Sequence, residues 1–253
     1  MAKLFNGGVG YSGINTARSA LSAILPLVNG KPVGEHHLVG RLLKGVKARR
    51  PSLPRYKHTW DPNLVLSFLR GAENKSLKEL TLNFVMLLAL VTGQRAQTLH
   101  ALKISEMEIE EGAINFVISS PLKTREPGSV ICLMNFEEDK LCVVTLLHQY
   151  LSKTKDVRKD DNLFISFVKP FRAVSCDTIR RWILEIMKSS GVNTAVFKAH
   201  STRAASTSAA LRNRVPIAAI MKAGMWRSEN TFCKFYNRPV ETLDNSFAQG
   251  VLS

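Results

Sequence analysis

The sequence of 253 residues contains few cysteines, and they are far apart. Cys132, Cys142, Cys176 and Cys233 form no CxxC pair and have no flanking histidine at metal-ligand spacing. This pattern argues against a disulfide framework and against a zinc site. We interpret the cysteines as the buried thiols of an intracellular protein.

Long apolar runs are also missing. A bilayer span needs about 18 or more consecutive apolar residues, whereas the longest apolar run covers only residues 84–91. The apolar stretch over residues 19–28 is interrupted by serines and by Pro26, which makes it a poor secretory signal. We therefore expect no membrane partner.

Acidic residues are scarce relative to basic ones. The chain has 35 Lys and Arg against 20 Asp and Glu, a formal charge of +15, and a pI of about 9.9. Residues 1–57 contain ten Lys or Arg and a single acid, Glu35. Such a surplus favours nucleic acid through counterion release, although an anionic membrane surface or simple solubility would also tolerate it. Residues 1–57 are a candidate DNA-facing surface, with a solvated basic arm as the alternative.

Periodicity predicts a fold that is mainly α with a small antiparallel β-sheet (α+β). Strand-like stretches over residues 113–119 and 129–133 flank a run of turn residues and predict a hairpin with a basic tip. Helices are predicted over residues 13–27, 36–47, 62–70, 77–91, 143–155, 177–190, 200–212, 216–223 and 229–238. A Pro-rich basic segment over residues 49–55 predicts the link between a small helical region and the main domain.

The helix predicted over residues 77–91 is apolar on nearly every face. It should therefore lie in the middle of the core. Ser76 and Glu79 have the spacing of a capping box at its start, and Gly93 is expected to end it. The next helix should begin close to Arg95. Gly191 and Gly224 are expected to end the helices that precede them.

Several residues suit the transfer of a phosphodiester between hydroxyls, which needs a nucleophile, cationic donors and an acid. Arg95 would lie at a helix start, where an ordinary surface arginine is the alternative. His200 and Arg203 are spaced i, i+3 and share a helix face, although such a histidine is more often structural. Trp226 and Tyr236 are further candidates, from an aromatic stretch. Phe232 and Phe235 of the same stretch are expected in the core, and a core position is the alternative for Trp226 and Tyr236 as well.

Taken in order with Lys123 at the hairpin tip, these residues resemble the tyrosine recombinase (phage integrase) family. The resemblance covers roughly residues 10–240. The wording is closest to the recombinases of DIRS-type eukaryotic retroelements, in Thr-Gly-Gln-Arg-Ala-Gln-Thr-Leu-His (92–100), Phe-Lys-Ala-His-Ser-Thr-Arg-Ala-Ala-Ser-Thr-Ser (197–208) and Thr-Phe-Cys-Lys-Phe-Tyr-Asn-Arg-Pro (231–239).

The resemblance implies a role for each of these residues. Tyr236 would attack the scissile phosphate and form a 3′-phosphotyrosyl link, while Arg95 and Arg203 hold the non-bridging oxygens. Lys123 would protonate the leaving 5′-oxygen, and His200 would assist proton movement at the nucleophile. Trp226 stands where most members have histidine and some have tryptophan, and Thr98 stands where many have an acidic residue.

The resemblance also implies an architecture and partners. Residues 1–55 would be a partial, truncated helical core-binding (SAM-like) region, residues 56–245 the catalytic domain and residues 246–253 a tail. The partner would be double-stranded DNA, bound as a homo-tetramer on paired sites in the nucleus, with no metal and no other cofactor. Expected DNA contacts are Lys47, Arg49, Arg50, Arg55, Lys57, Arg125 and Lys198.

Alternatives remain open for the activity. The leading hypothesis is a site-specific recombinase that integrates a circular DNA copy of a retroelement. The alternative from another class is a non-catalytic DNA-binding protein derived from such an element. A third possibility is type IB topoisomerase behaviour, in which the same strand is cleaved and resealed.

Overall fold

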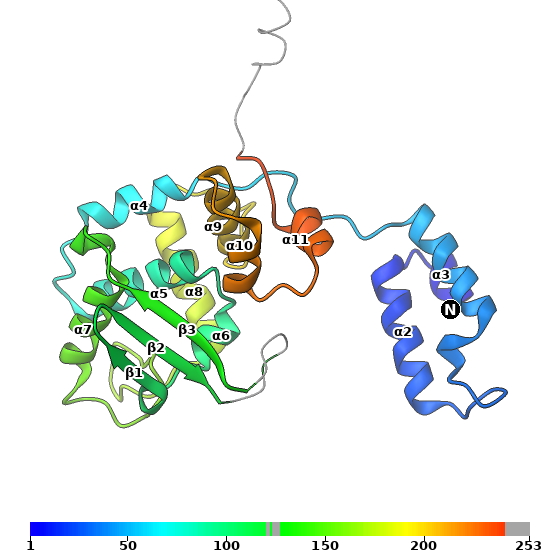
Figure 1. Ribbon diagram of the computed structural model, residues 1–253, viewed down its shortest axis with the longest axis horizontal. Helices are drawn as coiled ribbons and strands as arrows, with labels where there is room; N and C mark the ends of the chain where they lie inside the picture. Colours follow the sequence, from blue (N-terminus) through cyan, green and yellow to red (C-terminus); the bar gives the residue numbers. More distant parts are fainter. Residues whose placement is uncertain (120–121, 123–126, 241–253) are drawn as a thin grey trace, which may run out of the picture. The chain divides into compact units, whose positions relative to one another are not determined.

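The chain divides into two compact units, Met1–Arg55 and Tyr56–Ser253. The computed structural model describes residues 1–119, 122 and 127–240. Each unit has its own apolar core. Figure 1 shows the order of their elements along the chain. Among the described residues, no helix has both the length and the apolar character that crossing a membrane requires.

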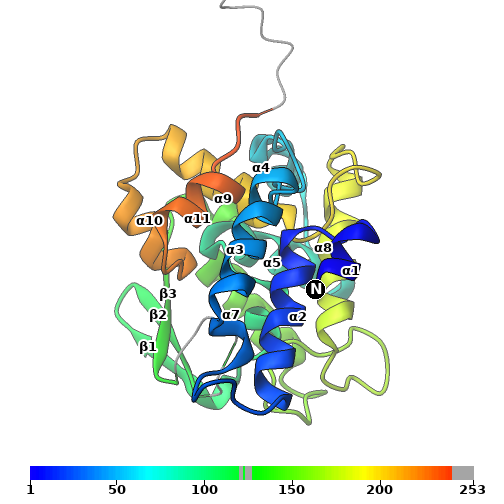
Figure 2. The same cartoon turned by 90° about the vertical axis from the view of Figure 1, so that its right-hand side faces the viewer.

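The smaller unit consists of helices whose core is formed by Ile14, Leu43 and Val46. The predicted helix over residues 13–27 is shorter at its end than expected. It stops at Ile24 because Leu25 precedes Pro26 and is extended, at φ −90° and ψ 149°, as sterics before a proline require. The helices, seen in Figures 1 and 2, are α1 (Ala2–Asn6), α2 (Tyr11–Ile24) and α3 (His37–Arg49), with a 3₁₀ turn at Val33–Glu35.

The larger unit consists of packed helices with a small antiparallel sheet at one side (Figure 1), which confirms the predicted α+β fold class. In its described part the strands are β1 (Met107–Glu110), β2 (Ala113–Ile118) and β3 (Ser129–Met134), in the order β1-β2-β3. The helices are α4 (Pro62–Gly71), α5 (Leu77–Thr92), α6 (Ala96–His100), α7 (Val143–Thr154), α8 (Cys176–Ser189), α9 (Ser201–Arg212), α10 (Ile217–Gly224) and α11 (Glu229–Phe235).

The edge strand β1 was not among the predicted elements. It pairs with β2 from Met107 opposite Phe116 to Glu110 opposite Ala113. Most of β1 is exposed, and its Ile109 side chain is 64% exposed. Its sequence Met-Glu-Ile-Glu does alternate between apolar and polar residues, but the run is only four residues long and half of it is glutamate, a residue type that is depleted in strands. The expected hairpin is confirmed, because β2 and β3 pair as far as Ile118 opposite Ser129.

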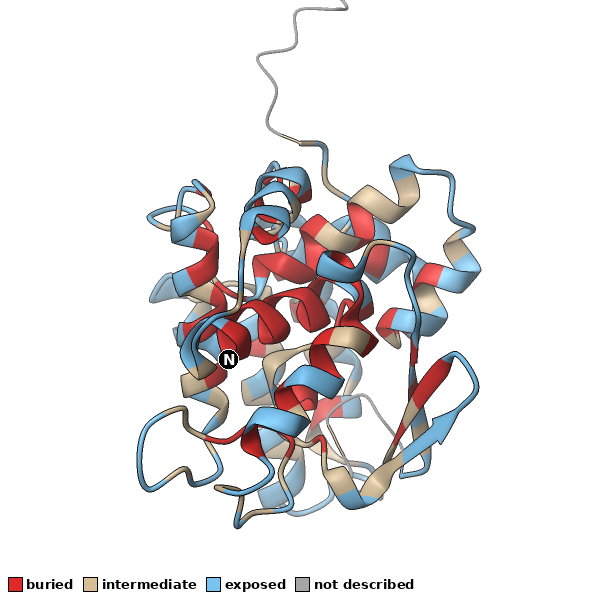
Figure 3. Ribbon diagram, turned by 90° about the vertical axis from the view of Figure 1, so that its left-hand side faces the viewer, coloured by how far each residue is buried: buried red, intermediate tan, exposed pale blue. Residues whose placement is uncertain are grey.

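Helix α5 lies in the middle of the core, as its apolar sequence predicts. Twelve of its 16 residues are buried, and it packs against α7, α8 and α9. Figure 3 shows the concentration of buried residues in the helices at the centre of the unit. The capping box of Ser76 and Glu79 is formed, and Gly93 ends the helix in the left-handed conformation at φ 58°. Because three helices pack against α5, its end is held in place and positions the residues that follow.

Two helix ends differ from the prediction near the C-terminal part of the unit. Gly224 does not end its helix; it is still helical, and Met225 takes the left-handed conformation at φ 55°. A Cβ atom at Gly224 would lie 1.7 Å from the Trp226 ring, so packing rather than backbone freedom requires this glycine. Helix α11 ends at Phe235 instead of residue 238, which makes Tyr236 its C-cap.

Truncation of Leu88 to alanine should destabilise the protein strongly, because this α5 side chain is fully buried. We expect Leu88→Ala to lower the free energy of unfolding by about 2–5 kcal/mol. Val91→Ala is the matched control on the same helix, since Val91 is 52% exposed, and it should change stability by about 0.5 kcal/mol. Urea unfolding of both variants measures the difference, and equal losses would contradict a central position for α5.

Candidate active site

The end of α11 brings Tyr236 to the beginning of α9. The Tyr236 hydroxyl lies 3.3 Å from Nε2 of His200, and the two rings meet edge to face with their centroids 6.0 Å apart. His200 is the N-cap of α9 and is exposed, while Tyr236 is partly buried. A hydroxyl and a possible base within hydrogen-bond reach form the pair that nucleophilic catalysis requires.

Arg203, one turn along α9, is buried with only 1% of its surface exposed. Its Nη1 donates a hydrogen bond to the carbonyl oxygen of Gly93 at 2.7 Å, and its Nη2 donates to the carbonyl oxygen of Gly224. The guanidinium lies 3.7 Å above the Trp226 ring and 5.4 Å from the centre of the Tyr236 ring. The arginine that the family pattern assigns to the phosphate therefore also joins the ends of α5 and α10.

Gln94 supports the same junction, although it was not among the residues expected at the site. Its side chain is buried, and Nε2 donates to the carbonyl oxygens of Ala223 at 2.7 Å and Thr92 at 3.2 Å. The last carbonyl groups of a helix lack partners within the helix. Gln94 and Arg203 thus satisfy neighbouring carbonyl groups at the end of α10, which fixes that end next to the end of α5.

Trp226 forms an aromatic cluster with Phe232 and Tyr236. Its ring meets those of Phe232 and Tyr236 edge to face, with centroids 5.1 Å and 4.9 Å away. Phe232 is fully buried, as predicted for a core residue, whereas Phe235 is only half-buried. The Trp226 indole Nε1 is buried and has no hydrogen-bond partner among the residues that the structure describes. It is a donor that a phosphate oxygen could use.

Of the remaining predicted site residues, the structure describes Arg95 but not Lys123 or Arg125. Arg95 is the N-cap of α6 and is partly exposed, two residues after the Gly93 carbonyl group that accepts from Arg203. Lys123 and Arg125 lie outside the described residues. The structure thus brings together His200, Arg203, Trp226 and Tyr236, and places Arg95 on the segment that leaves α5.

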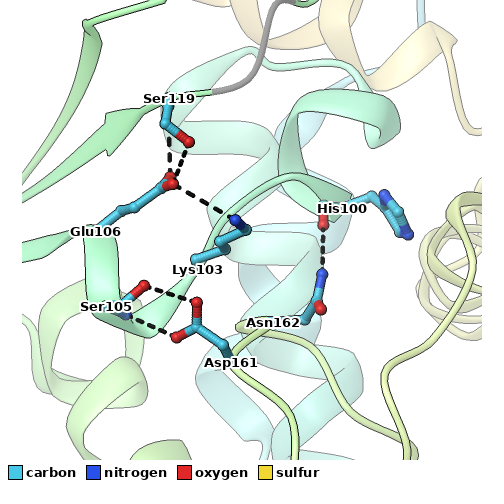
Figure 4. Close-up of polar contacts among 7 residues, drawn as sticks. All are labelled: His100, Lys103, Ser105, Glu106, Ser119, Asp161 and Asn162. Atoms are coloured by element: carbon cyan, nitrogen blue, oxygen red, sulfur yellow. Dashed lines mark hydrogen bonds and ion pairs between the residues drawn. The ribbon is translucent and has the colours of Figure 1, made fainter.

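The base of the hairpin that contains Lys123 is anchored by a charged network, shown in Figure 4. The Glu106 carboxylate accepts a hydrogen bond from the Ser119 hydroxyl, directly after β2. Nζ of Lys103 lies 3.7 Å from the same carboxylate, and only 17% of the Glu106 side chain is exposed. This contact fixes the point at which the chain leaves the sheet toward Lys123.

Asp161 anchors the same region from the other side (Figure 4). Its carboxylate accepts from the Ser105 amide at 2.9 Å and from the Ser105 hydroxyl at 2.6 Å, and its carbonyl oxygen accepts from the Ile104 amide at 2.8 Å. These hydrogen bonds, first that from the Ser105 hydroxyl and then that from its amide, lower the pKa of Asp161 below its ordinary value.

The predicted DNA contacts are mostly exposed basic side chains, but some engage their own unit. The Arg50 guanidinium donates to the carbonyl oxygen of Phe5 and lies 4.3 Å from the centre of its ring. Nζ of Lys198 donates to the carbonyl oxygen of Thr194 at 2.7 Å. The exposed members are Lys47, Arg49, Arg55 and Lys57. Phosphate contact by any of these residues stays a prediction.

Comparison with known proteins gives the family. Residues 60–242 match the model of the phage integrase family. Because this match covers most of the chain, the protein belongs to the phage integrase family, whose members are the tyrosine recombinases. A comparison with curated protein sequences gave no significant match.

Solved structures support the fold. The chain is similar to the XerH site-specific recombinase bound to palindromic difH substrate (16% identity, TM-score 0.61, covering 99% of this chain and 69% of that one). It is also similar to the Tn1549 transposon integrase in complex with transposon right end DNA (16% identity, TM-score 0.59, covering 99% of this chain and 82% of that one). A third similar structure is the lambda integrase tetramer bound to a Holliday junction (19% identity, TM-score 0.51, covering 96% of this chain and 65% of that one). At these identities the likeness shows the fold alone.

Gly224→Ala should disrupt the packing at the end of α10, because the added Cβ would meet the Trp226 ring. We expect a loss of about 1–3 kcal/mol in the free energy of unfolding. Gly71→Ala is the control at the end of α4, where a Cβ meets nothing within 4 Å, and it should leave stability nearly unchanged. Urea unfolding of the pair tests this packing; a harmless Gly224→Ala variant would contradict it.

Asp161 should make the stability of the hairpin base dependent on pH. Because its folded pKa is lowered, its contribution is complete above the unfolded pKa of about 3.9 and is lost as the pH falls through the folded pKa. The difference in unfolding free energy between wild type and Asp161→Asn should therefore shrink on acidification from neutral pH. Thermal unfolding between neutral pH and pH 3 would show this, and a constant difference would refute it.

Proposed function

We propose that this protein is a site-specific DNA recombinase that cleaves and rejoins strands through a 3′-phosphotyrosyl intermediate. The observation that carries the proposal is the 3.3 Å approach of His200 Nε2 to the Tyr236 hydroxyl, beside the buried guanidinium of Arg203. Membership of the phage integrase family supports it. A lone tyrosine in an aromatic cluster would have no need of a histidine at its hydroxyl and an arginine beside its ring.

The chemical step follows from these groups. The Tyr236 oxygen attacks the scissile phosphorus and loses its proton to His200 Nε2, which must then be the unprotonated ring nitrogen. The bond from phosphorus to the 5′-oxygen breaks, and that oxygen takes a proton from Lys123. Rejoining is the reverse, with a 5′-hydroxyl as the attacking group. One phosphodiester bond replaces another, so the step needs no outside source of energy.

Cationic and neutral donors stabilise the charge that develops on the phosphate. We assign this role to Arg95 and Arg203, whose planar guanidinium groups can bind two oxygens at once, and to the indole N–H of Trp226. Arg203 is engaged with the carbonyl groups of Gly93 and Gly224. We propose that DNA binding shifts the ends of α5 and α10 enough for the phosphate to share this guanidinium.

The biological setting is a further part of the proposal. The amino-acid sequence of residues 92–100, 197–208 and 231–239 supports an origin in a DIRS-type retroelement, whose circular DNA copy the enzyme would integrate. Strand exchange between two duplexes needs paired sites, and we propose a homo-tetramer on DNA, acting in the nucleus. The lambda integrase tetramer is bound to a Holliday junction, and a likeness in fold makes a similar assembly a reasonable proposal here.

A second candidate is a non-catalytic DNA-binding protein derived from such an element. The burial of Arg203 and Trp226, at 1% and 9% exposure, favours it, because groups that bind a phosphate must be reachable. The charge of +15 would serve either function.

Covalent trapping should separate the two. A pool of nicked duplexes with randomised sequence is incubated with the protein, and covalent adducts are separated on a denaturing gel and sequenced. Wild type should give an adduct, and Tyr236→Phe should give none because it lacks the attacking oxygen. Tyr150→Phe is the matched control: it loses the same atom from a fully buried side chain of α7 and should still form the adduct.

Binding of DNA by wild type without any adduct would overturn the catalytic proposal in favour of the second candidate. Where an adduct forms, duplexes with two copies of the captured sequence distinguish recombination from strand relaxation. Exchanged products indicate recombination, whereas a change in linking number alone indicates topoisomerase behaviour.

A further inference from the structure

Ser208 contacts the main chain on both sides of Asn237, which follows Tyr236. The Ser208 hydroxyl donates to the carbonyl oxygen of Tyr236 at 2.8 Å and accepts from the Arg238 amide at 2.9 Å. The side chain is 1% exposed. One buried hydroxyl thus satisfies an acceptor and a donor of the segment that leaves α11, where the helix supplies no partners.

Ser208 does not make the hydrogen bond that is common for a hydroxyl within a helix. A serine or threonine hydroxyl in a helix commonly bonds back to the carbonyl oxygen four residues earlier. The neighbouring Thr207 does so, donating to the carbonyl oxygen of Arg203 at 2.8 Å. Ser208 instead donates to another segment, which joins α9 to the end of α11.

The two ends of Tyr236 are thereby held by the same helix. Its hydroxyl meets His200 at the start of α9, and its carbonyl group meets Ser208 eight residues further along, a rise of about 12 Å in a helix. Arg203 lies between these positions in the sequence, and its guanidinium is 5.4 Å from the Tyr236 ring. The tyrosine therefore extends along α9, past the arginine, toward the histidine.

We propose that Ser208 is a positioning residue for the nucleophile: it fixes the main chain at Tyr236 so that the hydroxyl stays at His200 of the same chain. This inference rests on the proposed function. A second contact holds the following residues, since the Thr59 amide donates to the carbonyl oxygen of Pro239 at 2.8 Å. Loss of Ser208 alone should therefore misplace Tyr236 without releasing the whole segment.

The first test measures the contact without any need for catalysis. Hydrogen exchange of the Arg238 amide should be at least about tenfold faster in Ser208→Ala than in wild type, because the amide loses its acceptor. Ser208→Thr, which keeps a hydroxyl, should exchange like wild type. Thr81→Ala is the matched control: it removes a fully buried hydroxyl that bonds back within α5, and it should leave the Arg238 amide unchanged.

The second test measures the covalent adduct under single-turnover conditions. We expect Ser208→Ala to form it about tenfold more slowly than wild type, with DNA affinity unchanged, and Ser208→Thr to regain most of the rate. Thr81→Ala should stay within about twofold of wild type, since lost stability alone does not move the nucleophile. A substrate with sulfur in place of the 5′-bridging oxygen has a leaving group that needs no proton from an acid. It should restore the rate of adduct formation in Lys123→Ala, which lacks the acid, but not in Ser208→Ala.

The outcomes are separable. If wild type forms no adduct, the proposed function fails, and the exchange of the Arg238 amide still decides whether Ser208 holds this segment. If wild type reacts and Ser208→Ala reacts as fast as Thr81→Ala, the positioning role is overturned. It is equally overturned if the sulfur substrate restores the rate of adduct formation in Ser208→Ala, or if the Arg238 amide of that variant exchanges as slowly as in wild type.

Discussion

The burial of the Arg203 guanidinium is the constraint on which the rest of this site depends. A buried charge is costly unless hydrogen bonds and packing replace its water. Here the carbonyl groups of Gly93 and Gly224 accept from it, and the Trp226 ring covers its face. These partners come from two separate segments, Gly93 at the end of α5 and Gly224 to Trp226 at the end of α10, so satisfying one side chain fixes both helix ends next to each other.

Helix ends, rather than helix faces, build this site. Helix α5 ends at the left-handed Gly93, and α10 is followed by the left-handed Met225. Arg203 donates to the carbonyl groups of Gly93 and Gly224, and Gln94 donates to that of Ala223. Tyr236 is itself a C-cap, and its carbonyl group is satisfied by Ser208. A phosphate that approaches Arg203 would act on this junction, which gives a physical route from DNA contact to the position of the tyrosine.

Much of the fold could be predicted because its signals are local. The apolar sequence of α5, its capping box and Gly93 predict a central helix with defined ends, and the structure confirms each of them. The spacing of His200 and Arg203 predicts a shared helix; α9 contains Arg203, and His200 is its N-cap. The strand β1 could not be predicted, because it is exposed and is stabilised by pairing with β2. The end of α11 was misplaced since nothing in the sequence marks Phe235 as its last residue.

The sequence by itself determined the residue types, their order and the family resemblance, because composition, periodicity and motif spacing are properties of the chain alone. Only the tertiary structure decided that His200 meets the Tyr236 hydroxyl, that Gly224 is required by the Trp226 ring, and that Gln94 and Ser208 belong to the site. Apart from Gly224 and Trp226, which are two residues apart, these contacts join residues that are far apart in the sequence. Their distances are set by how α5, α9, α10 and α11 pack, which no local pattern specifies.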